Sequence, residues 1–88
     1  MQIEYSKKFI KEFKKCPVNI KDNFKRRLEI FIDNQNHPIL NNHPLIGELK
    51  DYRSININGN WRAIFMEIDG GQIIYFVAIG THSQLYSS

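Results

Sequence analysis

The chain has 88 residues, of which 42% are hydrophobic and 24% are charged, and its formal net charge is +3. This length fits one domain that spans residues 1–88, and the composition is that of a folded globular protein rather than a disordered chain. No apolar run approaches the roughly 20 residues that a membrane-spanning helix needs, and no signal peptide is recognisable, so we expect a cytoplasmic protein without a membrane partner.

The positive charge is concentrated in the first part of the chain. Residues 1–33 contain nine Lys or Arg residues against five Asp or Glu, whereas residues 34–88 contain three against four. A basic surface of this kind attracts a polyanion such as RNA, or an acidic protein, over a long range. A lysine-rich helix face that is merely solvated explains the pattern equally well, so the charge alone leaves both interpretations open.

The basic part of the chain predicts one strand followed by two helices. Alternating apolar and polar residues at Gln2–Tyr5 are typical of a strand, and Ser6 is a suitable N-cap for a helix that extends to Lys15. Pro17 ends this helix and suits the first turn of the next one. The apolar residues at helical spacing are Phe9, Ile10 and Phe13 in the first helix and Ile20, Phe24, Leu28 and Phe31 in the second.

The remaining residues predict a loop and then three antiparallel strands. Residues 34–42 are rich in asparagine and lack periodicity, so we expect a loop that leads into His43. Alternation marks a strand around Ile55 and Ile57, and further strands follow at 61–68 and 72–79 after turns at 58–60 and 69–71. This order indicates an α+β fold: an N-terminal strand, a two-helix hairpin packed on a twisted antiparallel sheet, and a short C-terminal turn or helix.

The motifs of several enzyme classes are absent from the sequence. Its three histidines lack the spacing of zinc ligands, and its single cysteine, Cys16, cannot form an internal disulfide. Gly70 and Gly71 lie in a predicted hairpin turn and lack the lysine and the helix of a phosphate-binding loop. We therefore expect no metal and no other cofactor.

Five residues have the chemistry to act on a phosphodiester: His43, Arg53, Arg62, His82 and Tyr86. Metal-free RNA cleavage needs a base for the ribose 2′-hydroxyl, a cation for the charge that develops on the phosphate, and an acid for the leaving oxygen. Imidazole serves as acid or base near neutral pH, and guanidinium binds phosphate oxygens in a fork. The same residue types also occur in inert domains, where Arg62 would pair with Glu48 or Glu67 and Trp61 would pack on the core.

Four short motifs in the second half of the chain carry a resemblance to a known family. They are HPLIGEL at 43–49, YRSI at 52–55, GNWR at 59–62 and GTHSQLY at 80–86. In this order and spacing they resemble the RelE/ParE toxin superfamily, and within it the RelE- and YafQ-type mRNA interferases, the toxins of bacterial type II toxin-antitoxin pairs. The resemblance covers essentially the whole chain and implies the fold described above.

The resemblance also implies an activity and its partners. Such toxins cleave mRNA in the ribosomal decoding site without a metal, by attack of the 2′-hydroxyl on the adjacent phosphate. They pair with a cognate antitoxin, so the implied partners are this antitoxin, the ribosome and mRNA. The implied catalytic residues are His43, Arg62, His82 and Tyr86, and those implied for RNA binding are Arg53, Asn56, Asn60 and Trp61.

The sequence departs from the YafQ-like pattern at three positions. Asn56 and Asn60 stand where YafQ-like toxins carry a histidine and an aspartate, and Ala78 stands where they carry an arginine. Asparagine can hydrogen-bond a phosphate or a base but does not transfer protons at neutral pH. We interpret Arg62 as the cation that replaces the one missing at Ala78.

Two other functions are compatible with the same scaffold, because a fold does not determine a function. One is a ParE-like toxin that inhibits DNA gyrase, which would have no need of His43 and His82. The other is a catalytically weak member of the superfamily that only binds its antitoxin.

Overall fold

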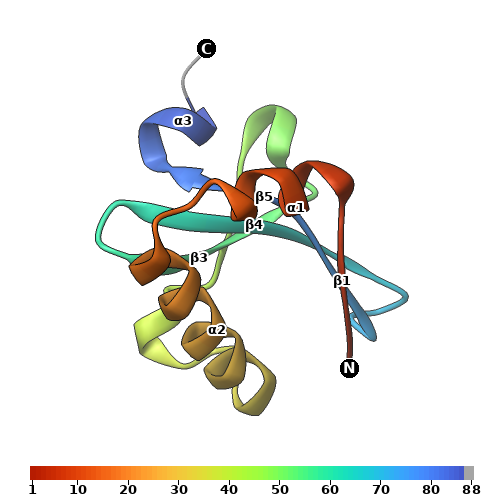
Figure 1. Ribbon diagram of the computed structural model, residues 1–88. Helices are drawn as coiled ribbons and strands as arrows, with labels where there is room; N and C mark the ends of the chain where they lie inside the picture. Colours follow the sequence, from red (N-terminus) through yellow and green to blue (C-terminus); the bar gives the residue numbers. More distant parts are fainter. Residues whose placement is uncertain (87–88) are drawn as a thin grey trace.

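The structure is a computed structural model that describes residues 1–86, which form one five-stranded sheet with two helices on one of its faces (Figure 1). Its elements in chain order are β1 (Gln2–Tyr5), α1 (Lys7–Lys14), α2 (Val18–Asp33), β2 (His43–Pro44), β3 (Arg53–Asn58), β4 (Trp61–Ile68), β5 (Ile73–Thr81) and α3 (His82–Tyr86). Single 3-10 turns occur at η1 (Pro38–Leu40) and η2 (Gly47–Leu49). The α+β class predicted from the sequence is confirmed.

Both long helices form where the periodicity predicts them. Ser6 caps α1, because its Oγ accepts a hydrogen bond from the Phe9 N–H at 2.9 Å. The apolar side chains that α1 and α2 bury are those of Phe9, Ile20, Phe24 and Phe31, with Phe13 and Leu28 partly buried against them. Ile10 is 44% exposed, so its assignment to the apolar face is wrong: it follows Phe9 directly and therefore points about 100° away from it around the helix.

The strands lie in the order β1-β5-β4-β3-β2. The pairs β3-β4 and β4-β5 are antiparallel, as the hairpin turns predict. The short strand β2, which the sequence does not predict, is antiparallel to β3, whereas β1 is parallel to β5. The predicted antiparallel sheet is therefore confirmed for β3, β4 and β5, and β1 is an exception to it. A tight turn forces two strands to run in opposite directions, but β1 reaches the rest of the sheet through two helices and is free of that constraint.

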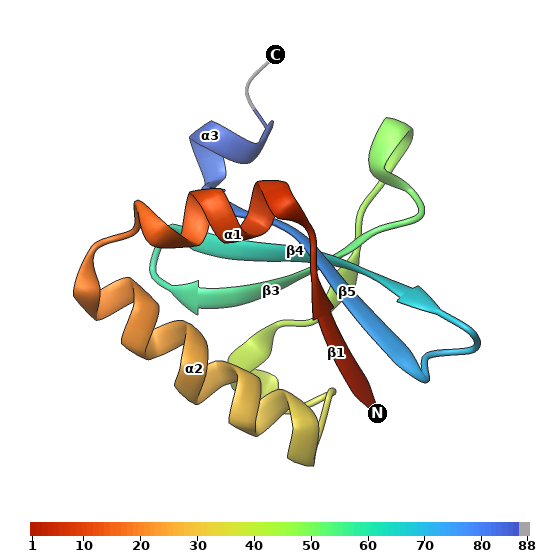
Figure 2. The same ribbon diagram turned by 45° about the vertical axis from the view of Figure 1, so that its right-hand side comes forward.

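The core lies between the two helices and one face of the sheet (Figure 2). Phe31 of α2 meets Phe65 of β4 edge-on at 5.2 Å between ring centroids, and Phe24 meets Phe76 of β5 in the same way at 5.3 Å. Side chains alternate between the faces of a strand, so neighbours of these buried residues point to the opposite face. That face is not covered by α1 or α2 and is available for a site.

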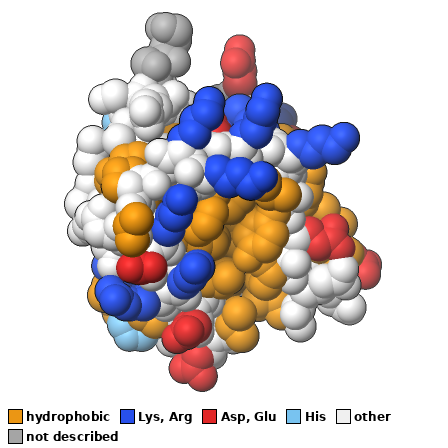
Figure 3. All heavy atoms as spheres, in the orientation of Figure 1, with side chains coloured by type: hydrophobic (Ala, Val, Ile, Leu, Met, Phe, Trp, Pro, Cys, Tyr) orange, Lys and Arg blue, Asp and Glu red, His pale blue; other side chains and the backbone are white. Residues whose placement is uncertain are grey.

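Basic side chains gather over α1, as Figure 3 shows. The exposed lysines of this region are Lys7, Lys8, Lys11, Lys14 and Lys15. Hydrophobic side chains are visible next to them on the same side of the molecule. Among the described residues, no helix combines the length and the apolar character needed to cross a membrane.

Candidate active site

An open cleft of about 390 Å³ lies where β4 begins and β5 ends. Its lining residues are Asn41, His43, Leu45, Arg62, His82 and Tyr86. These include all four residues that the resemblance implies for catalysis, although they come from three distant parts of the chain. The cleft is therefore the candidate active site.

His43 is held in this cleft by the pairing of β2 with β3. It lies opposite Ser54, and its Nδ1 is 2.7 Å from the backbone oxygen of Asn41. A carbonyl oxygen can only accept, so Nδ1 carries the hydrogen in this contact and the lone pair of the neutral ring is on Nε2. The sequence predicts a loop here, because a two-residue strand is too short to produce an alternating pattern.

Asn41 helps to orient His43 in the cleft, a role that the sequence pattern does not reveal. Its φ of 45° lies in the left-handed region, which asparagine adopts more readily than most residues. This conformation ends the η1 turn and directs the Asn41 carbonyl toward the imidazole of His43. An asparagine after a short turn that contains proline is the only sequence signal for it.

Arg62 brings a positive charge to the cleft that no carboxylate of residues 1–86 neutralises. Its Nη1 donates to the backbone oxygens of Gly59, at 2.6 Å, and Trp61, at 3.1 Å. Both acceptors are neutral, and within residues 1–86 the one salt bridge joins Lys8 and Glu12. The guanidinium therefore keeps its capacity to bind an anion.

His82 and Tyr86 reach the cleft because α3 begins directly at the end of β5. Thr81 Oγ1 accepts from the Gln84 N–H at 3.2 Å, and Gln84 Oε1 accepts from the Thr81 N–H at 2.9 Å. These reciprocal bonds are a capping box, which fixes the direction of the helix. His82 and Tyr86 lie one turn apart on this helix, with 4.7 Å between their ring centroids.

Two further contacts hold α3 against the sheet. The His82 N–H donates to the backbone oxygen of Asn60 at 2.9 Å. A Cβ at Gly80 would lie 3.0 Å from Gln84 Oε1, so the absence of a side chain at Gly80 lets α3 fold back closely. The Thr-x-x-Gln pattern at 81–84, preceded by glycine, is a sequence signal that could have revealed this arrangement.

Arg53 and Trp61, both predicted to bind RNA, do not line the cleft. Arg53 donates from Nε to Asn42 Oδ1 at 2.9 Å, and the alternation along β3 puts it on the same face as the buried Ile55. Trp61 is partly buried against the hydrophobic core, which agrees with the core-packing alternative for this residue. Neither side chain meets the two histidines in this structure.

The two asparagines that replace charged residues of the YafQ-like pattern have different surroundings. Asn60 lies in the exposed β3–β4 turn and contributes its backbone oxygen to the start of α3. Asn56 is half-buried and lies opposite Arg62 across the two strands. The Oδ1 of Asn56 and the Oγ of Ser54 are buried without a hydrogen-bond partner among the described residues. The Oδ1 of Asn56 is therefore an unused acceptor on this strand, but neither Asn56 nor Asn60 lines the cleft.

Comparisons with known proteins agree with this fold. The model of the family described as "Bacterial toxin of type II toxin-antitoxin system, YafQ" matches residues 1–87. YafQ from E. coli strain BL21(DE3) is 26% identical with a TM-score of 0.77, and the match covers 97% of each chain. A structure of the E. coli DinJ-YafQ complex matches with 26% identity, a TM-score of 0.75 and the same coverage. No curated protein matches the sequence.

A more distant structure extends the similarity in fold alone. The YoeB/ParE toxin from Agrobacterium tumefaciens is 13% identical with a TM-score of 0.78, over 93% of this chain and 99% of its own. The YafQ family model, in contrast, matches nearly the whole length of the chain. This chain therefore belongs to the YafQ family of bacterial toxins of type II toxin-antitoxin systems.

Proposed function

We propose that this toxin is a ribosome-dependent endoribonuclease that cleaves mRNA by attack of a ribose 2′-hydroxyl on the adjacent phosphate, without a metal. The observation that supports this proposal most directly is the composition of the cleft. It contains two imidazoles, a tyrosine, and a guanidinium that pairs with no carboxylate in the described part of the chain. These groups can supply the base, the acid and the cation that the reaction needs.

His43 is assigned the role of general base. Its Nδ1 hydrogen is engaged with the Asn41 carbonyl, which leaves the lone pair on Nε2 to take the proton of the 2′-hydroxyl. The 2′-oxygen then bonds to phosphorus and the bond to the 5′-oxygen breaks, so one product ends in a 2′,3′-cyclic phosphate. His82, which lines the same cleft from α3, gives the leaving 5′-oxygen its proton.

Arg62 and Tyr86 assist without transferring protons. The guanidinium of Arg62 offsets the negative charge that builds up on the phosphate oxygens in the transition state. Tyr86 packs against the His82 ring and offers an aromatic face on which a base of the substrate can stack. Asn56 lies opposite Arg62 on β3 but does not line the cleft, so its contact with RNA stays a prediction from the sequence.

The ribosome and a cognate antitoxin are the proposed partners. The lysines of the two N-terminal helices, α1 and α2, favour docking on ribosomal RNA, so ribosome affinity should fall steeply as salt concentration rises. Cosedimentation with ribosomes at low and high salt would measure this, and an affinity that does not change with salt would contradict it. The solved E. coli complex of DinJ with YafQ supports the expectation of an antitoxin that binds this chain.

Primer extension on an mRNA engaged by translating ribosomes tests the proposed activity. The purified protein should produce discrete breaks at codon positions, and these should disappear without ribosomes and with His82→Ala. His37→Asn is the matched control, because His37 is exposed and does not line the cleft, and asparagine can still accept the hydrogen bond that the His37 ring accepts from the Ile39 N–H. If no breaks occur and growth arrest survives His82→Ala, the nuclease proposal is wrong and gyrase inhibition becomes the next function to test.

A further inference from the structure

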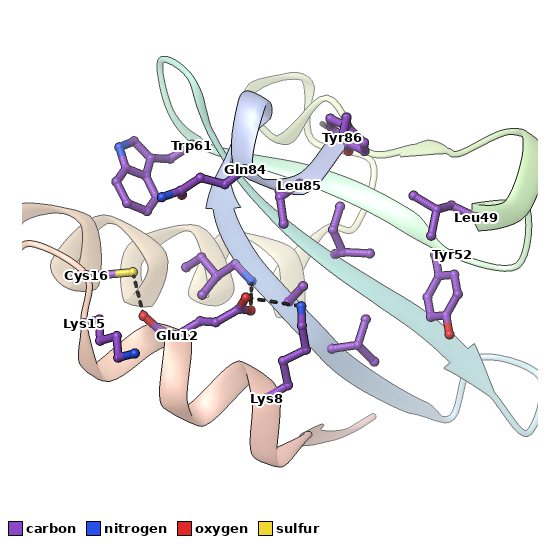
Figure 4. Close-up of a pocket in the computed structure, with 14 residues that line it drawn as sticks. Lys8, Glu12, Lys15, Cys16, Leu49, Tyr52, Trp61, Gln84, Leu85 and Tyr86 are labelled. Atoms are coloured by element: carbon purple, nitrogen blue, oxygen red, sulfur yellow. Dashed lines mark hydrogen bonds and ion pairs between the residues drawn. The ribbon is translucent and has the colours of Figure 1, made fainter. Parts of the chain in front are cut away.

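A groove of about 540 Å³ adjoins the catalytic cleft (Figure 4). Lys8, Glu12 and Lys15 rise from the α1 side of this groove, and Gln84, Leu85 and Tyr86 face them from α3. Tyr86 lines both the groove and the cleft. The two hollows therefore meet at this side chain.

The groove exists because β5 is longer than its neighbour β1. The pairing of β1 with β5 ends at Tyr5 and Phe76, so residues 77–81 extend beyond it. The strand-edge N–H groups there are already engaged, since Ile79 donates to Glu12 Oε1 at 3.1 Å and Thr81 donates to Gln84 Oε1. A protein segment that bound by adding a strand would have to displace these side chains, which disfavours that mode of binding.

The side chains of the groove suit single-stranded RNA. Tyr52 and Trp61 supply aromatic rings, Leu49 and Ile64 supply apolar surface, and Lys8 and Lys15 supply positive charge. Unpaired bases stack on aromatic side chains while lysines follow the phosphates, and this combination is typical of proteins that bind single strands. The role of Trp61 would then be in the groove rather than in the cleft.

A third hollow continues the groove along α1. It has a volume of about 430 Å³ and its lining residues are Lys7, Lys8, Lys11, Glu12 and Lys15. Three of these residues also line the groove, so the cleft, the groove and the lysine hollow are neighbours along the surface. The carboxylate of Glu12 lies 3.2 Å from Lys8 Nζ and accepts from Ile79 N–H, so its negative charge is partly offset.

We propose that these three hollows form one RNA track, in which the mRNA strand passes from the catalytic cleft over Tyr86 into the groove and onto the lysines of α1. Lys8 and Lys15 bind the phosphates of the nucleotides that flank the cleavage position. The direction of the track rests on the proposed nuclease function of the cleft, whereas the binding of single-stranded RNA in the groove does not.

The test uses a double variant that combines Lys8→Gln and Lys15→Gln, called the track variant. It is compared with a matched control variant. The control variant combines Lys25→Gln and Lys50→Gln. It removes the same charge, but from exposed lysines that line none of the three hollows. Binding is measured by fluorescence anisotropy with a labelled single-stranded RNA that carries 2′-O-methyl riboses and cannot be cleaved. All variants are checked for an unchanged melting temperature.

The track variant should weaken RNA binding at least about tenfold more than the control variant. The plot of log affinity against log salt concentration should also become less steep by about 1.4. Each phosphate contact on a single strand contributes roughly 0.7 to this slope, and the variant removes two lysines. In the primer-extension assay the same variant should raise KM and leave kcat unchanged. Equal losses of RNA affinity in the track and control variants would overturn the proposal.

The outcomes separate this proposal from the one on which it partly rests. Normal cleavage together with unchanged RNA affinity and KM in the track variant would refute the track and leave the nuclease intact. RNA binding that depends on Lys8 and Lys15 without any cleavage would refute the nuclease instead. A track variant that keeps its RNA affinity but loses affinity for an antitoxin would identify the groove as a protein-binding surface and overturn the proposal.

Discussion

Backbone carbonyls hold the charged and titratable side chains of the cleft. His43 Nδ1 contacts the Asn41 oxygen, and Arg62 donates to the oxygens of Gly59 and Trp61. A carbonyl orients a donor without contributing a formal charge, so the cleft keeps a net positive potential toward an anionic substrate. In this site the backbone does the positioning that a carboxylate performs in many catalytic dyads.

His43→Ala should lower the rate of mRNA cleavage by about 10²- to 10⁴-fold, the usual contribution of a general base. Ribosome affinity should stay unchanged, because the lysines over α1 are retained. Single-turnover cleavage on ribosome complexes measures the rate, and His37→Asn, which keeps the cap of the η1 turn, is the control. A rate within about twofold of the parent protein would remove His43 from the mechanism.

Cys16 should react slowly with iodoacetamide in the folded protein. Burial raises the pKa of the Cys16 thiol, and Glu12 raises it further, while the nearby Lys21 lowers it. Because the pKa of this thiol is raised in the folded state, folding favours its protonated form. The stability that the protonated thiol contributes is complete below the pKa of the unfolded state and is lost as the pH rises through the pKa of the folded state. Mass spectrometry at mildly alkaline pH should show much faster alkylation in denaturant, and equal rates would contradict the burial of this thiol.

At the scale of elements, the shortest segments carry most of the side chains that are proposed for catalysis. The strand β2 contains two residues and α3 contains five, yet between them they carry His43, His82 and Tyr86. Neither segment is long enough to be stable alone. Pairing with β3 stabilises β2, and the capping box with the Asn60 contact stabilises α3.

Thr81→Val should reduce cleavage more than it reduces stability. The substitution removes the hydroxyl that accepts from the Gln84 N–H, and the loss of such a cap costs about 0.5–2 kcal/mol, here confined to α3. His82 and Tyr86 would then lose their fixed orientation while the core stays intact. Ser83→Ala, an exposed position on the same helix, is the control for activity and melting temperature. Equal activity in both variants would show that the cap does not position the site.

At the scale of the whole molecule, the two faces of the sheet have separate tasks. The helix-facing side supplies Ile55, Phe65 and Phe76 to the core, and the opposite side supplies Arg62 to the candidate site. The cleft and the RNA track then continue around the end of β5 to the lysines of α1. Stability and recognition therefore depend on largely different residues.

Phe31→Ala should destabilise the protein by about 3–5 kcal/mol, because the ring is fully buried and its removal leaves a cavity between α2 and the sheet. Urea unfolding followed by circular dichroism measures the change. Ile32→Ala, a 54% exposed neighbour on the same helix, is the control and should cost far less. Similar losses in both variants would mean that Phe31 is not packed as described.

Local patterns in the sequence are sufficient for the helices and hairpins of this protein. The spacing of Ile20, Phe24 and Phe31 predicts the buried face of α2, and the turns at 58–60 and 69–71 predict antiparallel pairing of β3, β4 and β5. These features follow from backbone geometry over a few residues. The motifs at 43–49 and 80–86 likewise point to the family and to the histidines before any contact is known.

The sequence by itself thus determined the α+β class, the basic helical part and the family, and it proposed the chemical groups of the candidate site. Only the tertiary structure decided that β1 is parallel to β5, that Arg53 and Trp61 lie outside the cleft, and that Asn41 and the 81–84 capping box orient the two histidines. The physical reason is range: periodicity and turns act between neighbours, whereas these contacts join segments that meet only after the chain has folded.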